Sequence, residues 1–200
     1  MSEIKSICVY CGSSTGNNPA YREAGLTLGR SLAEHKIRLV YGGGTKGIMG
    51  AVAEGVRQNG GEVLGIIPEF LISKEASDAS LSHLSEVIVT KDMHERKHLM
   101  FQHSDAFVTL PGGIGTVEEI VEMMTWAQLG RHKKPMVFAN INRFWQPMLA
   151  LIDHMRAEGF IHTNHQLQPL VIDEAKDIVP AILAQNGRDK SGDADIISRM

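Results

Sequence analysis

The chain has 200 residues, of which 43% are hydrophobic and 22% are charged. These values are ordinary for one globular domain, and a formal net charge of −3 argues against a general attraction to nucleic acid or acidic membranes. No apolar run approaches the ~18 residues of a membrane span, and the N-terminus lacks the pattern of a secretory signal. We therefore expect a cytoplasmic protein with no membrane or nucleic-acid partner.

In chain order, the pattern predicts a strand at 6–10, a helix at 19–35, a strand at 38–41, a helix at 48–58 and a strand at 62–68. The segment 69–85 has no clear pattern. A strand at 87–90, a helix at 92–104 with Asp92 as its N-cap, a strand at 106–110 and a helix at 116–129 follow. A strand at 135–140, a helix at 144–158 ended by Gly159, a strand at 169–172 and a helix at 174–185 complete the series.

This alternation predicts an α/β fold. Strands that are apolar nearly throughout are buried on both faces, which indicates a parallel sheet with helices on each side. We expect a doubly wound, mostly parallel sheet of about seven strands in a Rossmann-like three-layer α/β/α arrangement. Residues 1–186 are predicted to form one domain, and residues 187–200, which lose the periodicity, a flexible C-terminal tail.

The two cysteines, Cys8 and Cys11, have the C-x-x-C spacing of redox and metal sites. The surrounding "SICVYC" resembles a strand, however, and side chains three apart on a strand face opposite sides of the sheet. A redox pair normally opens a helix, and zinc needs two further ligands. We expect a structural role for both cysteines.

Three predicted strands run into small-residue loops, "CGSSTG", "GGGTKG" and "PGGIGT". Glycine allows backbone amides to approach a ligand, and a following helix adds unpaired N–H groups and the positive end of its dipole. Tight turning and helix–strand packing are enough to explain any one of these loops taken alone, and none has the Walker spacing. Together, at the carboxyl ends of parallel strands, they predict a site for an anion such as phosphate.

Charged side chains accompany the third loop. Glu118 and Glu119 follow it, and acidic residues at a helix start complement the dipole. A carboxylate beside a phosphate site needs a nearby cation or a part in the chemistry. Arg96 and Lys97 are the candidate cations, although an Arg–Lys pair is often only solvated.

The stretch "HERKH" also matches the H-E-x-x-H pattern of zinc proteases through His94 and His98, with Glu118 as a possible third ligand. The positive charges of Arg96 and Lys97 argue against a cation there, and we expect no metal. Trp126 either packs in the core or lines a base pocket or a dimer face.

The linked motifs "MHERK" and "PGGIGTVEE" resemble those of the LONELY GUY (LOG) family. The resemblance extends over roughly residues 4–185 and includes "YCGSSTGNNPAY", "LVYGGGTKGIMGAVA" and "TWAQLGRHKKP". It implies a phosphoribohydrolase that cleaves the N-glycosidic bond of cytokinin riboside 5′-monophosphates, and of AMP in some bacterial relatives, to the free base and ribose 5-phosphate. Such proteins often carry the label lysine decarboxylase, but no lysine here has a context suited to a pyridoxal phosphate Schiff base.

By position, the resemblance implies a catalytic pair and a set of substrate contacts. The pair is Arg96 and Glu119. The nucleotide contacts would be Arg96, Lys97, Gly112, Gly113, Ile114, Gly115, Thr116, Glu119 and Thr125, with Glu75 matching a further contact although the segment after it is longer than usual. The resemblance also implies a homodimer with a shared site and no cofactor.

The residue types agree with that chemistry. Glycosidic cleavage passes through an oxocarbenium-like sugar, whose charge a carboxylate stabilises while activating water. We assign this role to Glu119 and expect Arg96 to orient it. The "GGIGT" amides would bind the 5′-phosphate. Glu118 would be a helix-start residue. Two alternatives stay open: a nucleotide-binding module without catalysis, and a zinc hydrolase using His94 and His98.

Overall fold

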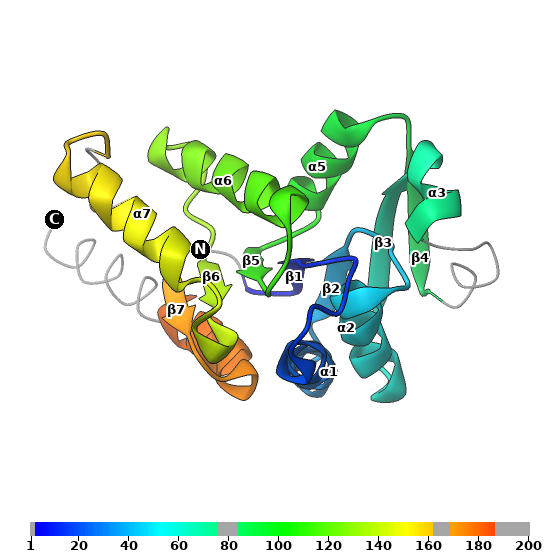
Figure 1. The fold of residues 1–200 in the computed structure, drawn as a ribbon. Coiled ribbons are helices and arrows are strands. Elements are labelled where there is room, and N and C mark those ends of the chain that lie inside the picture. The colour runs from blue at the N-terminus through cyan, green and yellow to red at the C-terminus, as the bar shows by residue number, and fades with distance from the viewer. Residues whose placement is uncertain (1–2, 76–83, 162–168, 187–200) are drawn as a thin grey trace, which may run out of the picture.

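Seven strands form one sheet in the computed structural model, which describes residues 3–75, 84–161 and 169–186 (Figure 1). Their spatial order is β4-β3-β2-β1-β5-β6-β7, and each pairing of neighbours is parallel. The strands are β1 (Ser6–Tyr10), β2 (Arg38–Tyr41), β3 (Val63–Pro68), β4 (Glu86–Thr90), β5 (Ala106–Thr109), β6 (Met136–Ala139) and β7 (Leu170–Ile172). The prediction of a doubly wound parallel sheet is confirmed.

Helices cover both faces of the sheet (Figure 1). The face with α1, α2 and the helical residues 178–186 lies opposite the face with α5, α6 and α7. The helices are α1 (Pro19–Glu34), α2 (Gly47–Gln58), α3 (Glu69–Glu75), α5 (Met93–Gln102), α6 (Ile114–Gln128) and α7 (Gln146–Ala157), with 3₁₀ turns η1 (Ile141–Arg143) and η2 (Ala175–Asp177). This is the predicted three-layer arrangement.

The core consists of two apolar clusters, one on each face, and β1 contributes to both. Ile7 and Val9 pack with α1 and α2, whereas Cys8 and Tyr10 pack with α5 and α6. Cys11 belongs to the first cluster and Cys8 to the second, so the two thiols lie on opposite sides of the sheet, as the strand prediction required. Burial raises the pKa of both thiols, which is unsuited to thiolate chemistry.

The contact between α1 and α2 depends on glycine. A Cβ on Gly29 would lie 2.3 Å from the carbonyl oxygen of Val52, and one on Gly55 would lie 2.4 Å from that of Leu26. The two helix backbones can approach this closely only without those side chains. The close packing fixes where α2 begins, beside the loop that follows β1.

Several boundaries differ from the predicted ones. The helix α6 begins at Ile114 rather than at residue 116, because Gly113 has the extended conformation of an N-cap. The helix α7 begins at Gln146 rather than 144, since the Trp145 amide donates to Asn140 Oδ1 at 3.0 Å. The Asp92 cap is confirmed, as its carboxylate accepts from the Glu95 amide at 2.9 Å.

The segment without a clear pattern begins with α3, and its residues 76–83 lie outside the described ones. The predicted last helix begins as the turn η2 and continues as a helix over 178–186. The predicted tail, 187–200, also lies outside the described residues. Within the described ranges, no helix combines the length and apolarity that crossing a bilayer requires.

Candidate active site

The three small-residue loops meet where the chain changes direction across the sheet, at the carboxyl ends of β1 and β5. The Gly12 amide donates to the Pro111 carbonyl at 3.1 Å, and the Gly12 carbonyl accepts from the amides of Ile48 (3.1 Å) and Met49 (3.3 Å). The first amides of α2 are therefore engaged in holding the loops together. The start of α6 is left as the better anion site.

The glycines of "PGGIGT" differ in what surrounds them. A Cβ on Gly112 would lie 2.2 Å from Thr116 Oγ1 and 2.9 Å from the Gly12 amide nitrogen, so packing alone demands glycine there. Apart from the adjacent residues and the backbone of the helix itself, no described atom lies within 4 Å of a Cβ built on Gly113 or Gly115. Neither has a positive φ. The open space at these two positions leaves room for a ligand to approach the first amides of α6, which have no intrahelical partners.

Glu119 lies in the second turn of α6 with 9% of its surface exposed. Burial raises the pKa of Cys8, Tyr10 and Cys11, and the negative charge of Glu119 raises each further. The positive charge of Arg96 acts in the opposite direction on the pKa of the Cys8 and Cys11 thiols, without cancelling the rise. Both predicted catalytic side chains therefore lie within electrostatic range of Cys8 in β1 and of Cys11 just after it.

Arg96 reaches this region from α5 and is 4% exposed. Its Nη2 donates to the Gly42 carbonyl at 3.3 Å, and its Nη1 lies 3.6 Å from Met93 Sδ. Its Nε–H is buried without a hydrogen-bond partner. A buried donor without a partner costs free energy, so this atom is a candidate contact for a bound anion.

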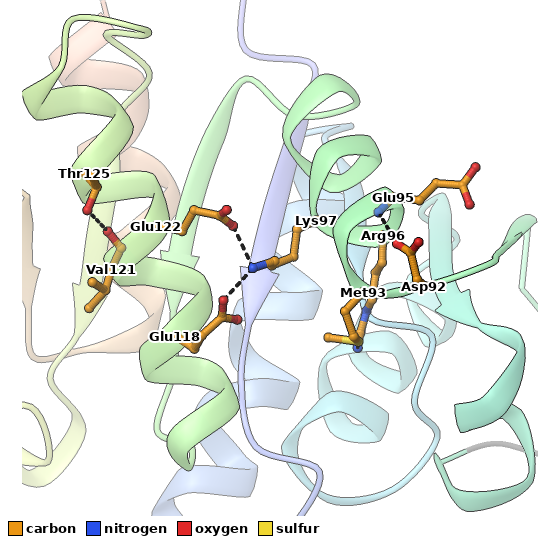
Figure 2. Close-up of polar contacts among 9 residues, drawn as sticks. All are labelled: Asp92, Met93, Glu95, Arg96, Lys97, Glu118, Val121, Glu122 and Thr125. Carbon is orange, nitrogen blue, oxygen red and sulfur yellow. Dashed lines mark hydrogen bonds and ion pairs between the residues drawn. The ribbon is translucent and has the colours of Figure 1, made fainter.

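Lys97 points away from Arg96, toward α6 (Figure 2). Its Nζ lies 2.5 Å from Glu118 Oε1 and 3.1 Å from Glu122 Oε2, and its side chain is 10% exposed. Burial lowers the pKa of the Lys97 ammonium, but its bonds to the two carboxylates outweigh this and leave the pKa above its ordinary value. Lys97 thus joins α5 to α6, the helices that carry Arg96 and Glu119.

The interpretation of Glu118 as a helix-start residue is wrong. Because α6 begins two residues earlier than predicted, Glu118 lies in its second turn, where it binds Lys97. Sequence reasoning missed Glu122 altogether. Its spacing of four from Glu118 puts both carboxylates on one side of the helix, and that signal was available.

The remaining predicted contacts differ in their exposure and position. Thr116 is buried under Gly112, and Ile114 is 85% exposed at the helix start. Thr125 lies on the exposed side of α6, where its hydroxyl donates to the Val121 carbonyl at 2.8 Å (Figure 2). Glu75 ends α3, and its side chain lies outside the described part.

Trp126 packs in the core, with its ring edge-on to Phe101 at 4.9 Å between centroids. His94 and His98 are both exposed, and His98 contacts Gln102. Among the described residues, no three His, Cys, Asp or Glu side chains gather as a metal site. The proposed third zinc ligand, Glu118, is bound to Lys97.

Comparison with known proteins places these features in a family context. Residues 49–182 match a family model described as "Possible lysine decarboxylase". The chain is 47% identical over 165 residues to "Probable cytokinin riboside 5'-monophosphate phosphoribohydrolase LOGL9" of Oryza sativa subsp. japonica, covering 82% of this chain and 71% of that protein. It is 43% identical over 178 residues to "Cytokinin riboside 5'-monophosphate phosphoribohydrolase LOG4" of Arabidopsis thaliana, covering 89% and 81%.

Solved structures share the fold. A molybdenum cofactor binding protein from Rippkaea orientalis superposes with a TM-score of 0.68 at 20% identity, covering 92% of this chain and 98% of that one. The molybdenum cofactor carrier protein from Chlamydomonas reinhardtii gives a TM-score of 0.65 at 20% identity, covering 91% and 99%. At this identity the likeness concerns the arrangement of strands and helices alone.

Proposed function

Because this chain belongs to the LOG family of cytokinin riboside 5′-monophosphate phosphoribohydrolases, we propose that it hydrolyses the N-glycosidic bond of such nucleotides. The products are the free base and ribose 5-phosphate. AMP, which has the same bond between adenine and ribose 5-phosphate, is a further substrate. No cofactor takes part in this proposal.

The observation that carries the proposal is the open space at Gly113 and Gly115, together with the buried charged side chains of Arg96 and Glu119. A 5′-phosphate at the start of α6 meets unpaired amides and the positive end of the helix dipole. Binding energy from this remote group positions the sugar for reaction. Arg96, with its unpartnered Nε–H, supplies a cation at the same end of the sheet.

Glu119 is the proposed catalytic carboxylate. As the bond to the base lengthens, positive charge develops on the ribose, and a carboxylate beside the anomeric carbon stabilises it. The same group accepts a proton from the attacking water. Arg96 orients Glu119 and contacts phosphate or ribose oxygens, which suits its planar set of donors.

Decarboxylation through a lysine Schiff base is the activity that the family model's description suggests, and the geometry does not favour it. Lys97, the lysine between α5 and α6, has its ammonium held by two carboxylates. A Schiff base forms from a neutral amine, and the raised pKa of Lys97 works against losing the proton.

We further propose a homodimer that completes the site. Ile114, Val121 and Leu129 form an apolar stripe on α6 with exposed fractions of 85%, 39% and 71%, and Thr125 lies on the same side because α-helical residues repeat every 3.6 positions. Thr125 lies about 9 Å along the helix axis from Glu119 and on a different face. In this proposal, Thr125 of one copy therefore contacts the nucleotide bound at Glu119 of the second copy.

The experiment is incubation of the purified protein with AMP and with an N6-prenylated AMP, followed by chromatography for free base. We expect base release by the wild type and a loss of about 10²–10⁴-fold in kcat for Glu119→Ala and Arg96→Ala, with the fold retained. Glu158→Ala, which removes an exposed carboxylate at the end of α7, is the control and keeps full turnover.

Nucleotide binding without base release from any monophosphate in the panel would instead identify a binding module. Stoichiometric zinc in the active protein, together with loss of activity in His94→Ala, would favour the zinc hydrolase.

A further inference from the structure

Gly42, directly after β2, lies against the end of the Arg96 side chain. The Gly42 carbonyl accepts the hydrogen bond from Arg96 Nη2 at 3.3 Å. Both residues are buried. The guanidinium also contacts Met93 Sδ, from the preceding turn of the same helix, at 3.6 Å (Figure 2). Gly42 is thus the link between the guanidinium and the sheet.

The backbone of Gly42 does not require glycine. Its neighbour Gly43 has a φ of +76°, which L side chains rarely adopt, but Gly42 is not among the residues with positive φ. The space around Gly42 decides instead. A Cβ there would lie 1.9 Å from Arg96 Nη2 and 3.1 Å from Arg96 Cζ, and the next neighbour, Met49 Sδ, lies at an ordinary 3.5 Å.

One side chain, that of Arg96, therefore occupies the place where a Cβ of residue 42 would stand. We propose that Gly42 is a positioning residue for Arg96: its carbonyl holds Nη2, and its missing side chain leaves the room in which the guanidinium lies. This inference rests on the proposed function, in which Arg96 orients Glu119 and contacts the nucleotide.

Gly42→Ala tests this role with little disturbance of the fold, because the obstructed atoms are the far end of a flexible side chain rather than backbone. The methyl group forces the guanidinium to move by an ångström or more. Displacement of a catalytic group by about 1 Å can cost 10²-fold in rate. We expect Gly42→Ala to lose about 100-fold in kcat/KM for AMP while its thermal unfolding midpoint stays within a few degrees of the wild type.

A double-mutant comparison separates this role from a general effect on the loop. In the Arg96→Ala background, assayed with enzyme in excess so that slow turnover is measurable, Gly42→Ala should cause no further loss. Gly25→Ala is the matched control. It adds a methyl group to α1, with nearest contacts of 3.3 Å to side chains of α2, and should retain activity.

Wild-type activity in Gly42→Ala overturns the positioning role and leaves the proposed function intact. An equal loss with and without Arg96 also overturns it, because the effect then acts on something else. A wild-type protein that releases no base from any nucleotide overturns the proposed function and this role with it.

Discussion

At the scale of single residues, glycine has two distinct uses in the loop before α6. Gly112 is demanded by the protein's own packing against Thr116 and Gly12, whereas Gly113 and Gly115 face open space. The same amino acid therefore permits close packing at one position and leaves room for the proposed phosphate at the next. Substitution by alanine distinguishes the two uses.

Gly115→Ala should leave the free energy of unfolding unchanged or raise it by about 0.5–1 kcal/mol, because alanine is the better helix former. The methyl group obstructs a phosphate at the helix start, so we expect KM for AMP to rise roughly tenfold or more, as for hydrogen bonds to a charged group worth about 1.5–3 kcal/mol.

Gly112→Ala should behave in the opposite way. It should lower the free energy of unfolding by about 1–3 kcal/mol through overpacking, measured by urea denaturation. A Gly115→Ala protein with wild-type KM would contradict the phosphate site.

Candidate residues with charged side chains in recognisable motifs could be proposed from the sequence. A residue whose role depends on a tertiary contact could not. Arg96 and Glu119 stand in motifs whose buried or clustered charges need a physical explanation, and both side chains act electrostatically on Cys8 and Cys11. Gly42 was visible only as one glycine in a loop. Gly42 and Arg96 are 54 residues apart in the sequence, and no local sequence pattern shows that they are in contact.

At the scale of elements, α5 and α6 are joined by the ion pairs of Lys97 with Glu118 and Glu122. These helices carry the proposed catalytic pair, so the ion pairs hold the two groups in register. The resemblance to the LOG family implied a nucleotide contact for Lys97 instead. The two interpretations give different results in a substitution.

Lys97→Met should lower the free energy of unfolding by roughly 1–2 kcal/mol, because it leaves the carboxylates of Glu118 and Glu122 without their cation. The loss stays small because solvent screens the half-exposed Glu118. The double variant Lys97→Met/Glu122→Gln should recover part of this loss, measured by urea denaturation. Wild-type stability with a selective rise in KM would instead identify Lys97 as a phosphate ligand.

Most strands and helices were predictable because buried parallel strands are continuous apolar runs, such as Ile66 and Ile67 in β3. The helix starts were less predictable. A glycine-rich loop resembles coil up to its last glycine, but an extended Gly113 allows α6 to begin at Ile114. The side of the helix on which Glu118 lies depends on that boundary, and so does its partner.

At the scale of the whole molecule, the apolar stripe of α6 predicts association. Leu129→Glu places a charge on the stripe, and we expect it to convert a dimer of twice 21.9 kDa into a monomer in sedimentation experiments. Base release should fall with it, because Thr125 of a second copy then no longer reaches the nucleotide. Phe160→Glu, which changes a 76% exposed residue after α7, is the matched control. A fully active monomeric wild type would contradict the shared site.

The sheet order also has a consequence for synthesis on the ribosome. Of the seven strands of this sheet, β1 emerges before the others, and it is the central one, with three strands on either side. Until β5 has been made, a nascent chain of about 100 residues can add strands to one flank of β1 only, and the other flank presents unsatisfied backbone groups. Synthesis paused before residue 106 would leave an aggregation-prone intermediate, and because "PGGIGT" follows β5, no shorter chain contains the proposed phosphate site.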